Sequence, residues 1–214
     1  MMYFFLNISW STLLFLICAS NLIIRPIVDT KAMKKLTDLY KSDPDSEKFI
    51  NSAKKFIRVH PFSVYNDMVR IFLLLPEIRV QNETAILKLI KNNYMFRVSE
   101  SSTDILIYDL FLLKEGGMQD AYELLLSRIQ KTSWASNFMQ KFKYAGSTST
   151  DNLPIDYREV SCLKTIIAFN TAVNIQPKDN KNANDLFREC YSFDKSQMMK
   201  SLILKRGGLI EKRK

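Results

Sequence analysis

Apolar residues recur at helical spacing along most of the chain. Phe49, Ile50, Ala53, Phe56 and Ile57 fall at i, i+1, i+4, i+7 and i+8, which places them on one face of a helix. Ser42-Asp43-Pro44 marks the expected start of this helix, and His60-Pro61 marks its end. The same pattern predicts further helices at residues 63–76 (stopped by Pro76), 82–92, 105–113 (closed by Gly116-Gly117), 118–129, 134–142 and 156–173, with two short helices ending near Arg206.

The pattern predicts an all-α fold, a compact bundle of about eight to ten short helices. Only five glycines occur in 214 residues, and tight β-hairpins need glycine at positive φ, so the scarcity also argues against a sheet. The alternative is a short α-solenoid of helical hairpins. Alternate helix starts are spaced by about 37 residues, as in helical repeats, although no side-chain consensus links one unit to the next.

The first 24 residues contain no charged side chain, and the chain becomes densely charged from Arg25 onward. Residues 1–20 fit a signal peptide, because an apolar core is followed by the small residues Cys18-Ala19-Ser20. Residues 1–24 are also just long enough to be a membrane anchor. In that case the basic residues that follow would place the domain in the cytosol.

The remaining chain predicts one α-helical domain at residues 25–206, with a polar linker at 145–155 and a basic tail at 207–214. The net charge is +9, and residues 195–214 contribute +6 of it through seven Lys/Arg and one Glu. Such a cluster fits a solvated terminus that aids solubility, and it also fits an acidic partner, for example an anionic membrane surface. A secretory route makes nucleic acid an unlikely partner. The candidate residues are Lys195, Lys200, Lys205, Arg206, Lys212, Arg213 and Lys214.

An apolar stripe runs through this basic segment and consists of Met198, Met199, Leu202 and Ile203. A basic, Met-rich amphipathic helix can dock on a membrane or in a partner's groove. The commoner fate of such a stripe is to pack as the last core helix, and that is our expectation here.

Two modification candidates depend on the compartment. Cys162 and Cys190 form an even pair once a signal peptide is removed, which predicts a disulfide in an oxidising lumen; the alternative is two buried free thiols. Asn82-Glu83-Thr84 is a glycosylation sequon, and Asn82 is equally suited to cap a helix.

The sequence contains no catalytic or cofactor-binding signature. His60 is its one histidine, and its expected role is a solvent-facing cap at a helix end. The glycines form no phosphate-binding loop, and no cluster of metal ligands is evident. We therefore expect a non-enzymatic, secreted α-helical protein that binds another macromolecule. The alternatives are a membrane-anchored helical adapter, a helical carrier of an apolar ligand, and an enzyme whose site no motif shows.

Overall fold

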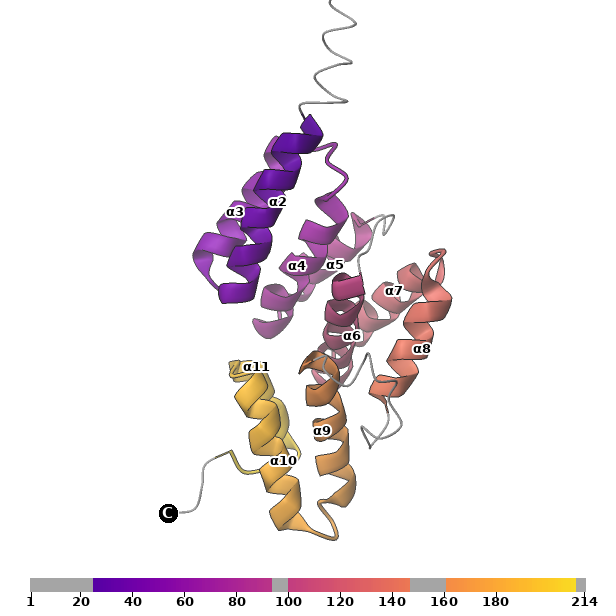
Figure 1. Ribbon diagram of the computed structural model, residues 1–214. Helices are drawn as coiled ribbons and strands as arrows, with labels where there is room; N and C mark the ends of the chain where they lie inside the picture. The colour runs from indigo at the N-terminus through magenta and orange to yellow at the C-terminus, as the bar shows by residue number, and fades with distance from the viewer. Residues whose placement is uncertain (1–24, 94–99, 147–160, 211–214) are drawn as a thin grey trace, which may run out of the picture.

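The computed structural model describes residues 25–93, 100–146 and 161–210, and within these ranges it contains ten α-helices and no strand (Figure 1). In chain order the helices are α2 (Arg25–Ser42), α3 (Glu47–Val59), α4 (Asn66–Arg79), α5 (Glu83–Lys91), α6 (Glu100–Glu115), α7 (Gln119–Gln130), α8 (Ala135–Ala145), α9 (Ser161–Ile175), α10 (Asn180–Phe193) and α11 (Gln197–Lys205). The predicted all-α class is confirmed. Residues 1–24, most of the predicted linker at 145–155, and residues 211–214 lie outside the described ranges.

The helices form a compact bundle rather than a solenoid. In a solenoid each unit contacts only its neighbours in sequence. Here α6 contacts α4, α7, α8 and α9, so it lies at the centre of the packing. The bundle predicted from the apolar pattern is therefore confirmed, and the solenoid alternative is not.

Helices α2, α3 and α4 enclose the first of two apolar clusters. Phe49, Ala53 and Phe56 are the buried face of α3, as the sequence spacing predicted. Ser46 caps this helix, because its Oγ accepts a hydrogen bond from the backbone N–H of Phe49 at 3.3 Å. The N-cap of α3 is therefore four residues after the predicted start at Ser42.

Helix α4 belongs to both apolar clusters. Val69, Phe72 and Leu73 pack with α2 and α3, whereas Ile71, Leu74, Leu75 and Ile78 pack in the larger cluster with α6 to α11. The predicted stop at Pro76 is wrong, because α4 continues to Arg79 with Pro76 inside it. Proline removes one backbone hydrogen bond, but the last turn is held by Ile78, which is fully buried.

The chain ends in a helical hairpin, α9 and α10, against which α11 packs. Met198, Met199, Leu202 and Ile203 of α11 are all buried, so the expectation that this stripe packs into the core is confirmed. After α11 the chain passes close over α10: a Cβ at Gly208 would lie 2.4 Å from Cδ2 of Phe187. The side-chain oxygen of Asn184 accepts a hydrogen bond from the Leu209 N–H at 2.7 Å and holds this segment in place.

Candidate functional site

The two cysteines are free thiols and are not within disulfide distance, so the predicted disulfide is wrong. In the α9–α10 hairpin Cys190 faces Thr165, whose carbonyl oxygen accepts from its Sγ at 3.4 Å. Thr165 lies three residues beyond Cys162, which is about 4.5 Å along the helix axis. Cys162 points instead toward α6, where its Sγ donates to the carbonyl oxygen of Asp104 at 3.5 Å.

Both thiols are poor nucleophiles, because Cys190 is buried and Cys162 is half-buried. Burial, together with the neighbouring Asp104 carboxylate, raises the pKa of the Cys162 thiol to about 12. Burial, with a smaller contribution from Glu189, also raises the pKa of Cys190 to about 12. Neither cysteine is therefore a candidate nucleophile.

We predict that a reducing agent leaves the thermal stability of the protein unchanged. A disulfide closing this loop of about 28 residues would contribute roughly 3–4 kcal/mol, and its reduction would lower Tm by about 6 °C or more. Thermal unfolding followed with and without dithiothreitol tests this. A clear fall in Tm on reduction would show that the two thiols bridge in solution.

Asn82 is an exposed helix cap. Its Oδ1 accepts from the Ala85 N–H at 3.3 Å, and its Nδ2 donates to Glu77 Oε2 at 2.9 Å. The capping alternative for this residue is therefore what the structure shows. The same geometry places the sequon at an accessible position, where α5 begins.

The predicted acidic-partner residues do not form one charged face on the described helix. Lys200 and Lys205 are five residues apart, and so about 140° apart around α11. Lys195 and Lys205 are exposed, Lys200 is half-buried, and Arg206 pairs with Glu115 of α6 at 2.7 Å. Lys212, Arg213 and Lys214 lie outside the described residues. The docking role for this segment stays a prediction.

His60 caps α3 as expected, but its side chain is only 19% exposed. Its Nδ1 lies 2.7 Å from Oδ1 of Asp29, and its ring stacks on Phe56 at 4.8 Å between centroids. The contact joins the first turns of α2 to the end of α3.

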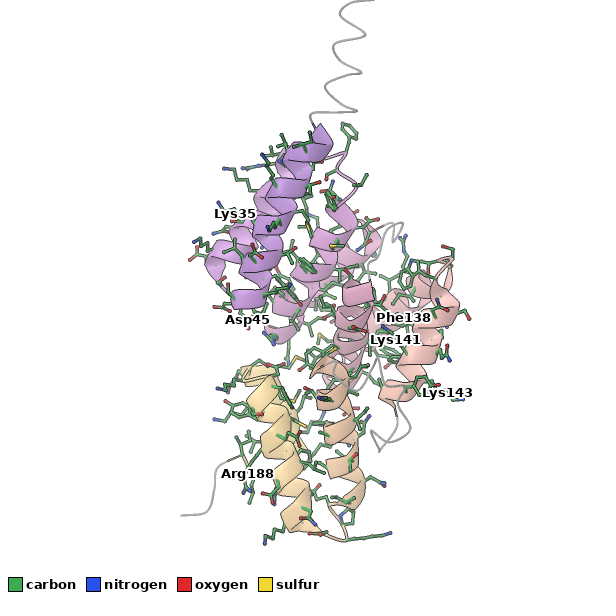
Figure 2. The ribbon with its side chains drawn as sticks, in the orientation of Figure 1. Lys35, Asp45, Phe138, Lys141, Lys143 and Arg188 are labelled. Atoms are coloured by element: carbon green, nitrogen blue, oxygen red, sulfur yellow. The ribbon has the colours of Figure 1, made fainter. Side chains whose placement is uncertain are left out.

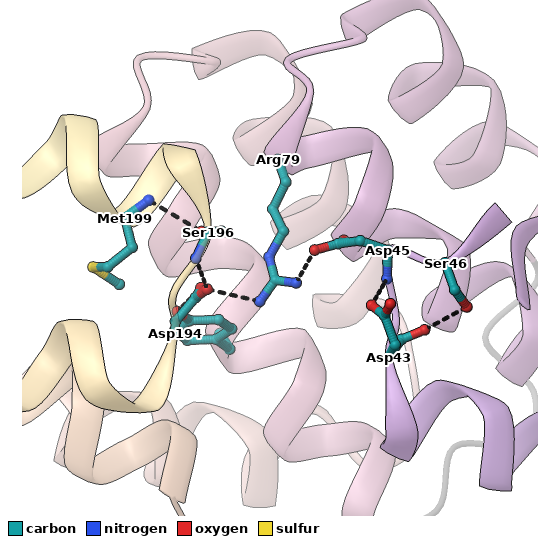
Figure 3. Close-up of polar contacts among 8 residues, drawn as sticks. Asp43, Asp45, Ser46, Arg79, Asp194, Ser196 and Met199 are labelled. Carbon is teal, nitrogen blue, oxygen red and sulfur yellow. Dashed lines mark hydrogen bonds and ion pairs between the residues drawn. The ribbon is translucent and has the colours of Figure 1, made fainter.

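A buried polar network is centred on Arg79, at the end of α4, and Asp194 (Figure 3). Its Nη1 donates to Asp45 Oδ2 at 2.6 Å, and its Nη2 donates to Asp194 Oδ1 at 2.9 Å. Asp194 also accepts from the Tyr108 hydroxyl at 2.5 Å and from the Ser196 N–H at 2.9 Å. The network therefore joins the α2–α3 connection, α4, α6 and the α10–α11 connection.

Electrostatics in this network favour the ionised pair. Burial alone would raise the pKa of the Asp194 carboxyl, but the Arg79 guanidinium and hydrogen bonds from Tyr108 and Ser196 hold that pKa below its ordinary value. Burial would lower the pKa of Arg79, but Asp194 and Asp45 raise it. Burial and Asp194 raise the pKa of Tyr108, which stays protonated as a donor. The arrangement ties four parts of the fold together, with Asp194 buried and Asp45 at its exposed edge.

Asp109 of α6 is fully buried, and neither of its carboxyl oxygens has a hydrogen-bond partner among the described residues. Burial raises its pKa well above the ordinary value, against a smaller lowering by Arg79. The sequence analysis missed this residue, although a lone charge in the apolar run at 105–113 was a usable signal. Arg79 and Asp194 gave no such signal, since they are 115 residues apart in the chain.

A groove of about 450 Å³ lies between α3, α4 and α5 and is the best candidate binding site. Its apolar lining comes from Ile57, Leu73, Ala85 and Leu89. Its polar lining consists of Lys54, Arg70, Glu77, Asn82, Lys88 and Asn92, three basic residues against one acidic residue. An apolar floor with a polar rim is how binding sites for other molecules are commonly built.

Elsewhere the polar contacts are structural. Lys141 of α8, labelled in Figure 2 beside Phe138, is buried and lies 3.2 Å from Asp104 of α6. Within residues 25–93, 100–146 and 161–210 no group of three His, Cys, Asp or Glu side chains could hold a metal ion. None of the described helices is both long and apolar enough to cross a membrane.

No family model, curated protein or solved structure matches this chain.

Proposed function

We propose that the chain is a non-enzymatic helical adapter that binds a segment of a partner protein in the groove between α3, α4 and α5. The observation that carries the proposal is the composition of the groove, an apolar floor within a mostly basic rim. An amphipathic segment with apolar anchors and acidic flanks matches both features.

Charge at the rim favours acidic flanks. Glu77, the one acidic lining residue, already lies 3.4 Å from Lys54 and accepts a hydrogen bond from Asn82. Lys88 is exposed on α5 at the rim. A partner's carboxylates would thus meet a positive field, which improves both orientation and association rate.

The secreted form could carry a glycan on Asn82, whereas the membrane-anchored form with a cytosolic domain would not. Asn82 lies in the rim of the groove. A glycan on its Nδ2 would obstruct the groove, so the proposed binding belongs to a form in which Asn82 is unmodified. Of the forms the sequence predicts, that is the membrane-anchored adapter with a cytosolic domain. N-terminal sequencing of the mature protein and a glycosidase mobility shift test this. An N-terminus at Asn21 with a glycan at Asn82 would favour the secreted form instead.

We predict that peptides selected from a random display library against the protein will be amphipathic and acidic. Replacing Ala85 and Lys88 with glutamate should weaken their binding at least tenfold, which corresponds to about 1.4 kcal/mol, because it fills the floor and reverses charge at the rim. Lys178→Glu, on the exposed turn between α9 and α10, is the matched control and should change little. Peptides that bind the groove variant as well as they bind the control would contradict the proposal. Co-purified lipid would point to the apolar-ligand carrier.

A further inference from the structure

Exposed apolar side chains gather at one end of the molecule. Ile27 and Val28 lie in the first turn of α2 and are 55% and 47% exposed. Val59 ends α3 and is 54% exposed, while Phe62 and Val64, in the connection to α4, are 83% and 52% exposed. We call these five residues the apolar end.

Two polar contacts bring the two parts of the apolar end together. The Thr30 hydroxyl lies 3.1 Å from the Tyr65 hydroxyl, and His60 Nδ1 lies 2.7 Å from Asp29 Oδ1. Each contact links the beginning of α2 to the segment between α3 and α4. Figure 1 shows the beginning of α2 and the connection between α3 and α4 at the same end of the molecule. The two segments that carry these five residues therefore lie side by side, and we treat the five side chains as one surface.

This surface lies where the uncharged segment of the sequence joins the domain. Residues 1–24 contain no charged side chain, and α2 begins at the next residue, Arg25. Ile27 is three residues from Ile24, so at most about 11 Å of chain separates them. If residues 1–24 lie in a bilayer, the apolar end is held at its surface.

The charges around the apolar end suit an anionic surface. Residues 27–37 and 53–65 contain six Lys/Arg and one carboxylate, Asp29, which is buried against His60. Lys31, Lys34 and Arg58 are exposed in the first turns of α2 and the last turn of α3. A basic rim around exposed apolar residues is the composition of segments that rest on anionic lipid headgroups.

A second groove continues from this surface between α2 and α3. It has a volume of about 240 Å³, and Val59 and His60 take part in its lining. Leu36, Leu39 and Phe56 contribute apolar atoms, and Lys35 and Lys55 contribute ammonium groups (Lys35 is labelled in Figure 2). An apolar lining with two cations also suits an anionic lipid, so the surface that could contact lipid continues from the apolar end into this groove.

We propose that the apolar end rests on an anionic lipid bilayer, with Phe62 inserted among the headgroups and the neighbouring lysines and Arg58 contacting lipid phosphates. An exposed phenylalanine loses contact with water on insertion, and the cations gain counter-charges. The proposal shares with the proposed function only the retention of residues 1–24, and it does not involve the α3–α4–α5 groove.

The test is a depth measurement on the full chain in nanodiscs of phosphatidylcholine and phosphatidylserine. A nitroxide is attached at Phe62→Cys, with Lys178→Cys on the α9–α10 turn as the matched control; Cys18 is replaced by serine. The half-buried Cys162 and the buried Cys190 remain, since their raised pKa makes them slow to label. Collision with oxygen, which concentrates in lipid, is compared with collision with a water-soluble nickel complex.

We expect the label at position 62 to favour oxygen and the label at position 178 to favour the nickel complex. Reversing Lys31, Lys34 and Arg58 to glutamate should move the label at 62 toward the aqueous profile. Equal nickel accessibility at 62 and 178 would overturn the proposal. Shielding of position 62 from both reagents, unchanged in detergent, would also overturn it, because protein would then cover the surface. The groove variant with Ala85 and Lys88 replaced should keep the depth at 62, so failure of one proposal is distinguishable from failure of the other.

Discussion

Arg79→Leu should lower the free energy of unfolding by about 3–5 kcal/mol, the usual cost of leaving one member of a buried ion pair uncompensated. Asp194 is 5% exposed and would lose the guanidinium that neutralises it. Its Tyr108 and Ser196 donors would remain, so the loss comes mainly from the missing opposite charge. Urea unfolding at neutral pH measures the effect.

Arg206→Leu is the matched control, since it removes an arginine that also pairs with a carboxylate, Glu115. Arg206 is 47% exposed, whereas Arg79 is 15% exposed, so the control should cost no more than about 1 kcal/mol. Equal effects from the two variants would show that the Arg79 network is solvated and adds little to stability.

The Arg79 effect should also depend on pH in a defined direction. The folded-state pKa of Asp194 lies below its ordinary value, so the contribution of the pair is fully present above the unfolded pKa, which is about 3.9. It is lost as the pH falls through the lower, folded-state pKa. The difference in the free energy of unfolding between wild type and Arg79→Leu should therefore become smaller in acid. A difference that is independent of pH would contradict this account.

Asp109→Asn should stabilise the protein at neutral pH. The folded state keeps the Asp109 proton above the pH at which the unfolded chain loses it, because burial raises its pKa. The folded state then binds more protons, so rising pH reduces stability by about 1.4 kcal/mol for each pH unit in that interval. Asparagine cannot titrate, so the stability of the variant should not show this fall with rising pH.

The measurement is urea unfolding at several values from pH 4 to pH 8. Wild type and Asp109→Asn should have similar free energies of unfolding near pH 4. The difference should grow as the pH rises, with the variant the more stable. Asp120→Asn is the control, because Asp120 is exposed on α7 and the chemical change is the same. A less stable Asp109→Asn with an unchanged pH slope would mean that Asp109 is ionised and has a partner.

The sequence predicted the helices where an apolar stripe or a local signal was present. Phe49, Ala53 and Phe56 are the buried face of α3, Asn82 caps α5, and Gly117 adopts a φ of +77° just after α6. Each signal acts within a few residues, so it can be read without knowing the fold. Helix α2 was not predicted, although Met33 and Leu36 are buried and Leu39 and Tyr40 pack beside them at helical spacing, because this stripe is short and lies among lysines.

Features that depend on helix packing were not predictable in this way. The expected disulfide rested on an even count of cysteines, but the register of the α9–α10 hairpin places Cys190 opposite Thr165. The Arg79–Asp194 pair joins residues with no sequence relation, and the α3–α4–α5 groove needs three helices to exist. Such contacts follow from tertiary geometry, which local spacing does not encode.

The Arg79 network has a consequence for the stability of the chain while it is being synthesised. Asp45 and Arg79 emerge from the ribosome well before Asp194, so a nascent chain has the cation and only one of its two carboxylates. Helix α6 is also left without α9, which packs against it in the finished protein. A chain truncated before residue 194 should thus remain a substrate for chaperones and proteases.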